Sequence, residues 1–234
     1  MSLIVTISGH TFLPRSIRKD GTVVDLGANR GYFARQIISR YGAIRYFAVE
    51  ANPYLAASLA QEVPAIRVRH AAVTDQNTMI TLNLSRNCEQ SSIVESVAGE
   101  GASQVSVPGR TLDAILRENE IDEIDLLKVD IEGAEVGVFS AVSDDTLAKI
   151  SQITIEFHDF LGAYSPEAVL LMVERFRQCG FCGVRFSRSN MNWLFFNPGR
   201  CGVGTLAMLY IKHVLPYVRW FRLAIGLDRD GSIP

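Results

Sequence analysis

The sequence predicts an α/β fold, in which a doubly wound, mostly parallel seven-stranded sheet of the Rossmann-like type carries a C-terminal helical appendage. Two observations carry this prediction. Short apolar runs typical of strands alternate with helix-like segments along most of the chain, as in successive βαβ units. A glycine-containing turn follows the first of these runs and opens a helix. The composition, with 48% hydrophobic and 21% charged residues, is that of an ordered globular protein.

The first three strands and the helices between them are expected within residues 22–70. Residues 22–26 form a short apolar run that predicts a buried strand. The helix that follows places Phe33 and Ile37 on one face, and Gly42 ends it. The second helix opens with Pro53, at a position that favours proline. The expected strands are 22–26, 45–49 and 66–70, and the expected helices are 31–41 and 53–61.

The alternation weakens over residues 75–108. Residues 78–84 alternate like a small strand, and a polar stretch through Ser91, Ser92 and Gly101 follows. We therefore expect an inserted hairpin or loop that lies over the functional site. Regular alternation then resumes, with helices expected at 111–119, 134–141 and 165–179, strands at 124–129 and 152–157, and a terminal antiparallel pair at 181–186 and 192–196.

We divide the chain into an N-terminal segment at 1–20, one α/β domain at 21–200 and a C-terminal amphipathic helical tail at 201–234. The net charge of −2 argues against a nucleic-acid partner. Because no signal peptide opens the sequence, the cytoplasm is the expected location. Cys179 and Cys182 lack the second pair that a zinc site needs, so no metal is assigned from cysteine spacing.

The tail is apolar over residues 203–227 but contains Lys212, Arg219 and Arg222. Each of these charges costs roughly 2.5–3.5 kcal/mol at the centre of a membrane span, so a span is not expected. We predict a kinked amphipathic helix that packs on its own domain, on a second subunit of a homo-oligomer or on a membrane surface, in that order of preference. Its expected partners near the N-terminus are Phe12, Leu13 and Pro14.

The turn after the first strand predicts the cofactor. Gly27 and Gly31 let a ligand approach the backbone and let the chain reverse tightly. A dinucleotide site needs a second glycine where this chain has Asn29, and the carboxylate of Asp25 would repel a pyrophosphate. Asp25 would instead suit a cationic amino group, directly or through water. S-adenosylmethionine carries such a group and has no phosphates.

The second strand ends in Glu50, which is placed to accept hydrogen bonds from both ribose hydroxyls of a nucleoside. Ala51, and Ala71 and Ala72 after the third strand, could flank the adenine. The cofactor-binding residues expected from the sequence are Asp25, Gly27, Asn29, Gly31, Glu50, Ala51, Ala72 and Asp130.

Segment 126–135 reads Leu-Leu-Lys-Val-Asp-Ile-Glu-Gly-Ala-Glu and resembles the FkbM family of methyltransferases, which typically shows Asp-x-Glu-Gly-x-Glu at the end of the fourth strand. Segments 110–113 (Arg-Thr-Leu-Asp), 155–158 (Ile-Glu-Phe-His) and 91–93 (Ser-Ser-Ile) resemble other parts of the same family. The resemblance spans about residues 21–196. It implies a class I methyltransferase that moves a methyl group from S-adenosylmethionine, usually to a hydroxyl oxygen of a sugar, polyketide or other metabolite.

A hydroxyl is a poor nucleophile, so an O-methyltransferase benefits from a base, which contributes roughly 10²–10⁴-fold. Asp130 and His158 follow neighbouring predicted strands and therefore lie close together. We predict His158 as the base, with Asp130 or Glu156 orienting it or contacting the amino group of the cofactor. Lys128 shares a strand face with Asp130, and a structural ion pair is its expected role.

Other interpretations of these residues stay open. Asp130 could cap the following helix, Glu132 and Glu135 could be ordinary first-turn acids, and His158 could be structural. A magnesium ion is a further possibility, since carboxylates are hard ligands that can help polarise a hydroxyl. The residues considered for that ion are Asp130, Glu156, His158 and Asp159.

Three other functions compete with an active O-methyltransferase. A catalytically silent adenosylmethionine-binding module of the same fold is the main alternative. A nicotinamide oxidoreductase is disfavoured by Asn29 and Asp25. Nucleic-acid methylation is disfavoured because the chain has no Asn-Pro-Pro-Tyr-type element after the fourth strand and no basic excess.

Overall fold

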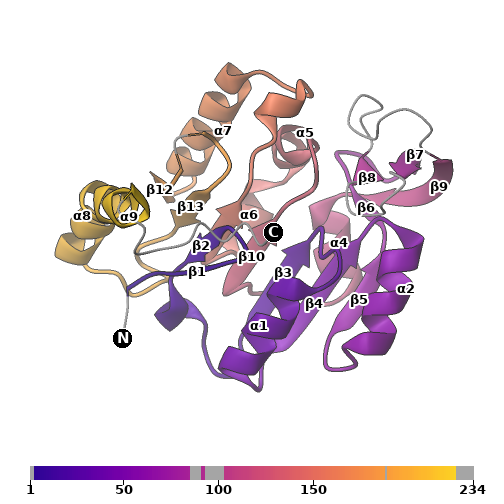
Figure 1. The fold of residues 1–234 in the computed structure, drawn as a ribbon, viewed down its shortest axis with the longest axis horizontal. Helices are drawn as coiled ribbons and strands as arrows, with labels where there is room; N and C mark the ends of the chain where they lie inside the picture. Colours follow the sequence, from indigo (N-terminus) through magenta and orange to yellow (C-terminus); the bar gives the residue numbers. More distant parts are fainter. Residues whose placement is uncertain (1–2, 85–90, 93–102, 188, 225–234) are drawn as a thin grey trace.

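A computed structural model describes residues 3–84, 91–92, 103–187 and 189–224. Its central feature is a seven-stranded sheet of order β12-β13-β11-β10-β3-β4-β5 (Figure 1). Neighbouring strands are parallel except β13, which is antiparallel to both β11 and β12. The predicted doubly wound sheet and its terminal antiparallel pair are therefore confirmed. The strands are β3 (Thr22–Leu26), β4 (Arg45–Glu50), β5 (Arg67–His70), β10 (Leu126–Val129), β11 (Gln152–Ile155), β12 (Cys182–Arg185) and β13 (Trp193–Phe196).

Helices cover both faces of this sheet, because its strands are apolar on both sides. Alternation along β3 sends Val24 and Leu26 to one face and Val23 to the other. The first face packs against α4 (Leu112–Glu118), α5 (Glu135–Ala141) and α7 (Pro166–Gln178), and the second against α1 (Tyr32–Tyr41) and α2 (Pro53–Glu62). A short helix, α6 (Asp144–Ala148), follows α5.

Polar side chains fix where several helices begin. Asn52 caps α2 by accepting hydrogen bonds from the backbone N–H groups of Tyr54 and Leu55, and Pro53 supplies the first turn. Thr111 and Ser165 cap α4 and α7 in the same way. Each cap typically contributes about 1 kcal/mol, so these residues define helix starts within the limits that the sequence predicted.

An N-terminal hairpin, β1 (Val5–Ile7) and β2 (His10–Phe12), packs on the α1 side of the sheet and was not predicted. Its two-residue turn places Ser8 and Gly9 at positive φ, as a type I′ turn requires. Asn192 anchors it by donating hydrogen bonds to the Gly9 carbonyl and the Thr11 hydroxyl. A 3-10 turn, η1 (Pro14–Ser16), follows and leads into β3.

The weakly patterned region forms a second sheet of order β6-β9-β7-β8. The predicted strand at 78–84 is present as β7 (Met79–Leu84), and it pairs antiparallel with β9 (Ser103–Arg110), which was not predicted. Two short strands complete the sheet, β6 (Ala72–Val73) and β8 (Ser91–Ser92). Gly101 and Ile93 lie outside the described residues.

The tail forms two helices, α8 (Thr205–His213) and α9 (Leu215–Ala224), that lie beside β12 at one end of the central sheet (Figure 1). Ile211 is buried against a cluster that includes Leu13, as predicted, whereas Phe12 packs on the ring of Phe33. Leu206 points outward and is 84% exposed. Within the described part of the chain, no helix has the length and apolar character needed to cross a membrane.

Candidate active site

The turn between β3 and α1 brings its backbone against the end of β10. Gly27 has a φ of +78°, and a Cβ added to it would lie 1.7 Å from the carbonyl oxygen of Asp130. Only glycine fits such a position, as the sequence predicted. Gly31 has a φ of +73°, and an added Cβ would meet Leu59 of α2. Asn29 also has a positive φ, which asparagine tolerates better than most residues.

Glu50, the last residue of β4, binds the backbone of this turn. Its Oε2 accepts a hydrogen bond of 2.7 Å from the backbone N–H of Asn29, and its Oε1 accepts one of 2.8 Å from that of Asn52. Burial raises the pKa of Glu50, while the two backbone donors act in the opposite direction. Each carboxylate oxygen retains further acceptor capacity for a ligand hydroxyl.

A cleft of about 620 Å³, open to solvent, lies at the carboxyl ends of β3, β4 and β10. The carboxyl ends of the strands are where open α/β sheets bind their ligands. Of the predicted cofactor residues, Gly27, Asn29, Glu50, Ala51, Ala72 and Asp130 line it; Leu55, Val73 and Leu82 also line it and were not predicted.

Asp25 is not among the described residues that line the cleft, and its side chain is fully buried, so the direct contact predicted with a cofactor amino group is wrong, while the contact through water stays a prediction. Its side chain is fully buried between β3 and its neighbours, because strand alternation turns it into the layer under α1. The Tyr46 hydroxyl donates a 2.6 Å hydrogen bond to its Oδ2, and Lys128 Nζ lies 3.1 Å from its Oδ1. Asp25 therefore positions Lys128.

Lys128 links that buried acid to the cleft. Its Nζ donates a 2.6 Å hydrogen bond to the Gly27 carbonyl and lies 3.5 Å from Asp130 Oδ2. Burial lowers the pKa of Lys128, but the charges of Asp25 and Asp130 outweigh burial and raise it overall. The ion pair predicted for Lys128 is confirmed, and it holds the turn of Gly27 against the end of β10.

His158, which follows β11, is tightly held. Its Nδ1 lies 2.7 Å from Glu135 Oε1, and its Nε2 lies 3.6 Å from both Asp130 Oδ1 and Glu132 Oε2. Burial lowers the pKa of His158, but the hydrogen bond and charge of Glu135 raise it overall to about 9. The ring is therefore positively charged at neutral pH.

Glu135 orients His158, a role that the sequence prediction gave to Asp130 or Glu156. It begins α5 and is fully buried. Its Oε2 accepts a 2.6 Å hydrogen bond from the Tyr164 hydroxyl, and its Oε1 accepts one of 3.2 Å from the Gly133 backbone. Acids are common in the first turn of a helix, where the helix dipole favours them, but Glu135 also fixes the ring of His158.

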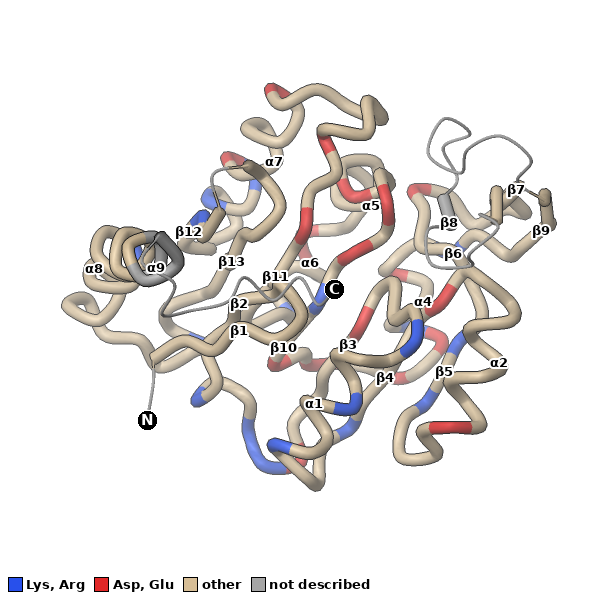
Figure 2. Tube along the Cα trace, in the orientation of Figure 1, with Lys and Arg blue, Asp and Glu red and all other residues tan. Residues whose placement is uncertain are grey.

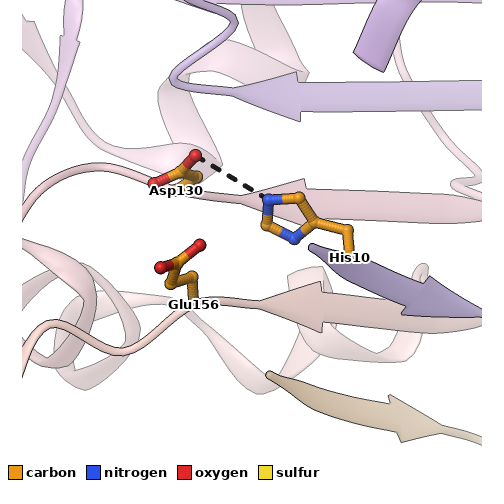
Figure 3. A group of neighbouring side chains, drawn as sticks. All are labelled: His10, Asp130 and Glu156. Atoms are coloured by element: carbon orange, nitrogen blue, oxygen red, sulfur yellow. Dashed lines mark ion pairs between the residues drawn. The ribbon is translucent and has the colours of Figure 1, made fainter. Parts of the chain in front are cut away.

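His10, from β2, enters the same region and was not predicted. It is only 3% exposed, and its Nε2 lies 3.7 Å from Asp130 Oδ2 (Figure 3). The ring packs edge-on against Phe33, with centroids 5.7 Å apart. Burial lowers the pKa of His10, while Asp130 acts in the opposite direction.

Acidic residues are concentrated where β10 and β11 end (Figure 2). Glu156 is half-buried there, and burial together with the charge of Asp130 raises its pKa to about 7. Asp159, considered as a metal ligand, instead accepts a 2.7 Å hydrogen bond from Asn190. The described residues form two groups whose possible metal-binding atoms lie within 4.8 Å of one another: His10, Asp130 and Glu156, and Asp130, Glu132 and His158.

Residues 25–182 match the family described as the methyltransferase FkbM domain. This chain belongs to the FkbM methyltransferase family. The match covers the cleft, the β3 turn and His158, but it does not include His10. Family membership supports S-adenosylmethionine as the methyl donor.

The FkbM protein is 26% identical over 179 residues to the AMB antimetabolite synthetase AmbE of Pseudomonas aeruginosa. The matched part is 60% of this chain but 8% of that much longer synthetase. A solved fibrillarin pre-rRNA processing protein of Methanococcus jannaschii matches 81% of this chain and 70% of its own, with 12% identity and a TM-score of 0.47. A TehB-like SAM-dependent methyltransferase of Corynebacterium glutamicum matches 77% of this chain and 82% of its own, with 13% identity and a TM-score of 0.41.

The structure of this FkbM protein brings together all three predicted catalytic residues. Asp130 lies within 3.6 Å of His158 Nε2, and Glu156 belongs to the group around His10. The Asp-x-Glu-Gly-x-Glu segment supplies three acids of the site from one turn, where Glu132 has a positive φ of 52°. Strained backbone at that position places the Glu132 side chain beside His158.

Proposed function

We propose that this FkbM protein transfers a methyl group from S-adenosylmethionine to a hydroxyl oxygen of a small molecule. The observation that carries the proposal is the cleft at the carboxyl edge of the sheet. Glu50 lines it at the end of β4, and His158 lies 3.6 Å from Asp130, which lines it at the end of β10. Glu50 suits the ribose of a nucleoside, and His158 suits proton transfer.

The residues of the cleft match the chemistry of the donor. Glu50 presents two carboxylate oxygens, which suits the two ribose hydroxyls, and Ala72 and Leu82 offer apolar surface to the adenine. Glu50, Asp130 and Glu132 give the cleft an acidic lining, which favours a cationic ligand over one with phosphates. When bound, adenosylmethionine would supply the methyl group: its C–S bond would break as the acceptor oxygen bonds the methyl carbon, and adenosylhomocysteine would be the leaving group.

His158 serves as the base in this proposal. Its Nε2 points to the acids at the end of β10 and takes the hydroxyl proton of the acceptor, while Glu135 holds Nδ1 and stabilises the charged ring that results. Collinear positioning of the two reactants supplies a further share of catalysis, up to roughly 7–11 kcal/mol for well-oriented reactions. The residues that position the acceptor are those of the β10 and β11 ends.

A metabolite is the proposed acceptor class. The relative from Pseudomonas aeruginosa is named as the synthetase of an antimetabolite, which supports a small-molecule substrate. The chain has a net charge of −2, which gives a polyanionic acceptor no general attraction.

The pH dependence of turnover tests the base. Because the pKa of His158 is raised from 6.5 to about 9, the ring can accept a proton only as the pH approaches that value. With an acceptor found by screening, kcat/KM is expected to rise with pH from 6.5 towards 9 and then level off. The His158→Ala variant should lose this rise and turn over roughly 10²–10⁴-fold more slowly. Its adenosylhomocysteine affinity should be nearly unchanged, and wild-type turnover would remove His158 from the mechanism.

Calorimetric titration with adenosylhomocysteine, with NAD as the control ligand, tests the proposal as a whole. We expect adenosylhomocysteine to bind and NAD not to bind, because the acids of the cleft would repel the pyrophosphate of NAD. Binding of NAD alone, or of neither ligand by a folded sample, would contradict the proposed function. Tight adenosylhomocysteine binding with no transfer to any hydroxyl acceptor would instead favour the silent binding module of the same fold.

A further inference from the structure

The N-terminal hairpin adds a nitrogen ligand to two carboxylates of the site. A ring nitrogen of His10 and one carboxylate oxygen each of Asp130 and Glu156 lie within 4.8 Å of one another. Figure 3 shows the imidazole and the two carboxylates converging from β2 and from the ends of β10 and β11. His10 lies outside residues 25–182, so the family match does not account for it.

The second ring nitrogen of His10 has a partner of its own. Its Nδ1 lies 3.5 Å from the Thr154 hydroxyl, which fixes the ring through the nitrogen that faces away from the carboxylates. Its Nε2 is 3.7 Å from Asp130 Oδ2, a distance too long for a hydrogen bond. A side chain that is 97% buried thus aims an imidazole nitrogen at the place where the two carboxylates meet, with Nε2 3.7 Å from Asp130 Oδ2.

The surrounding charge favours a cation. Asp130, Glu132, Glu135 and Glu156 face the two positive charges of Lys128 and His158 in this part of the site. Lys128 offsets only part of the Asp130 charge, from 3.5 Å, because its shorter contacts are with the Gly27 carbonyl at 2.6 Å and Asp25 at 3.1 Å. A divalent ion would balance the remaining negative charge at the point where the acids meet.

We propose that His10, Asp130 and Glu156 bind one divalent transition-metal ion, such as Mn²⁺. One imidazole nitrogen and two carboxylate oxygens suit Mn²⁺, Fe²⁺ or Zn²⁺ better than Mg²⁺, which prefers oxygen ligands alone. Glu156 is half-buried and lies at a strand end, so its side chain has room to close on the ion.

The role of the ion rests on the proposed function, whereas the binding of the ion does not. A metal at the ends of β10 and β11 lies beside His158, where the acceptor hydroxyl must come. There the ion would orient that hydroxyl and lower its pKa, which would make the proton easier for His158 to remove.

Titration of the full chain with Mn²⁺, followed by the loss of the electron paramagnetic resonance signal of the free ion, tests the site. We expect one bound ion per chain in the wild type, and at least ~10-fold weaker binding in His10→Ala and in Glu156→Gln. His213→Ala serves as the matched control, because His213 is exposed at the end of α8, and it should bind as the wild type does.

Two outcomes would overturn the proposal: a wild-type chain that does not bind Mn²⁺, or variants of His10 and Glu156 that both bind it as tightly as the wild type. Glu156→Gln preserves the shape of the side chain, so it tests the ligand even if His10→Ala unfolds. Adenosylhomocysteine titration of the same samples reports the proposed function separately. Mn²⁺ binding without adenosylhomocysteine binding would keep the metal site and reject its role in methyl transfer.

Discussion

Glu50→Ala is expected to weaken adenosylhomocysteine binding by at least ~100-fold, which corresponds to about 2.7 kcal/mol. Hydrogen bonds to a charged group contribute roughly 1.5–3 kcal/mol each, and the substitution removes both proposed bonds to the ribose hydroxyls. It also frees the backbone N–H groups of Asn29 and Asn52, which now bind the two oxygens of Glu50. The turn that forms one wall of the cleft therefore loses its anchor as well.

Calorimetry on the purified variant measures this effect, with Glu62→Ala as the control. Glu62 is an exposed acid at the end of α2 whose partner is Arg35, so its removal changes the charge of the chain without touching the cleft. Thermal unfolding of both variants separates a lost ligand contact from a lost fold. Equal affinity of wild type and Glu50→Ala would place the nucleoside elsewhere on the protein.

The part of the site that could be predicted depends on residues close together in the sequence and on the order of the strands. Strand β3, its glycine turn and α1 are contiguous, and the constraint at Gly27 is a steric one that only glycine satisfies. Glu50 ends the adjacent parallel strand, and parallel strands bring their carboxyl ends to one edge of a sheet. For the same reason, Asp130 and His158 were expected to meet. These are consequences of strand order, which alternating strands and helices reveal.

Long-range packing determined the rest, and the sequence carried little sign of it. The strands of the hairpin are three residues each, too short to show alternation, and only the turn at Ser8 and Gly9 could have indicated them. His10 was therefore missed. The position of Asp25 just before Gly27 predicts a place in the turn, but the face to which a strand residue points depends on what packs there. Glu135 resembled a first-turn acid until its contact with His158 was known.

Lys128→Met is expected to lower the free energy of unfolding by about 3–5 kcal/mol, the usual cost of removing one partner of a buried ion pair. Asp25 is fully buried and would keep only the hydrogen bond from Tyr46, so its charge would be left uncompensated. The variant also frees the Gly27 carbonyl. Denaturant unfolding measures the loss, with Arg35→Met as the control, because the exposed pair of Arg35 and Glu62 should contribute about 0–1 kcal/mol.

The double variant Lys128→Met with Asp25→Asn separates the ion pair from general damage to the core. Asparagine is uncharged and nearly the same size, so most of the cost should be recovered if the buried charge of Asp25 is the cause. If the double variant is as unstable as the two single effects added together, Lys128 stabilises the fold through Gly27 and packing, and its charge is incidental. Recovery would mean that Asp25 belongs to the site indirectly: it keeps Lys128 charged, and Lys128 in turn holds Gly27 and Asp130 at the wall of the cleft.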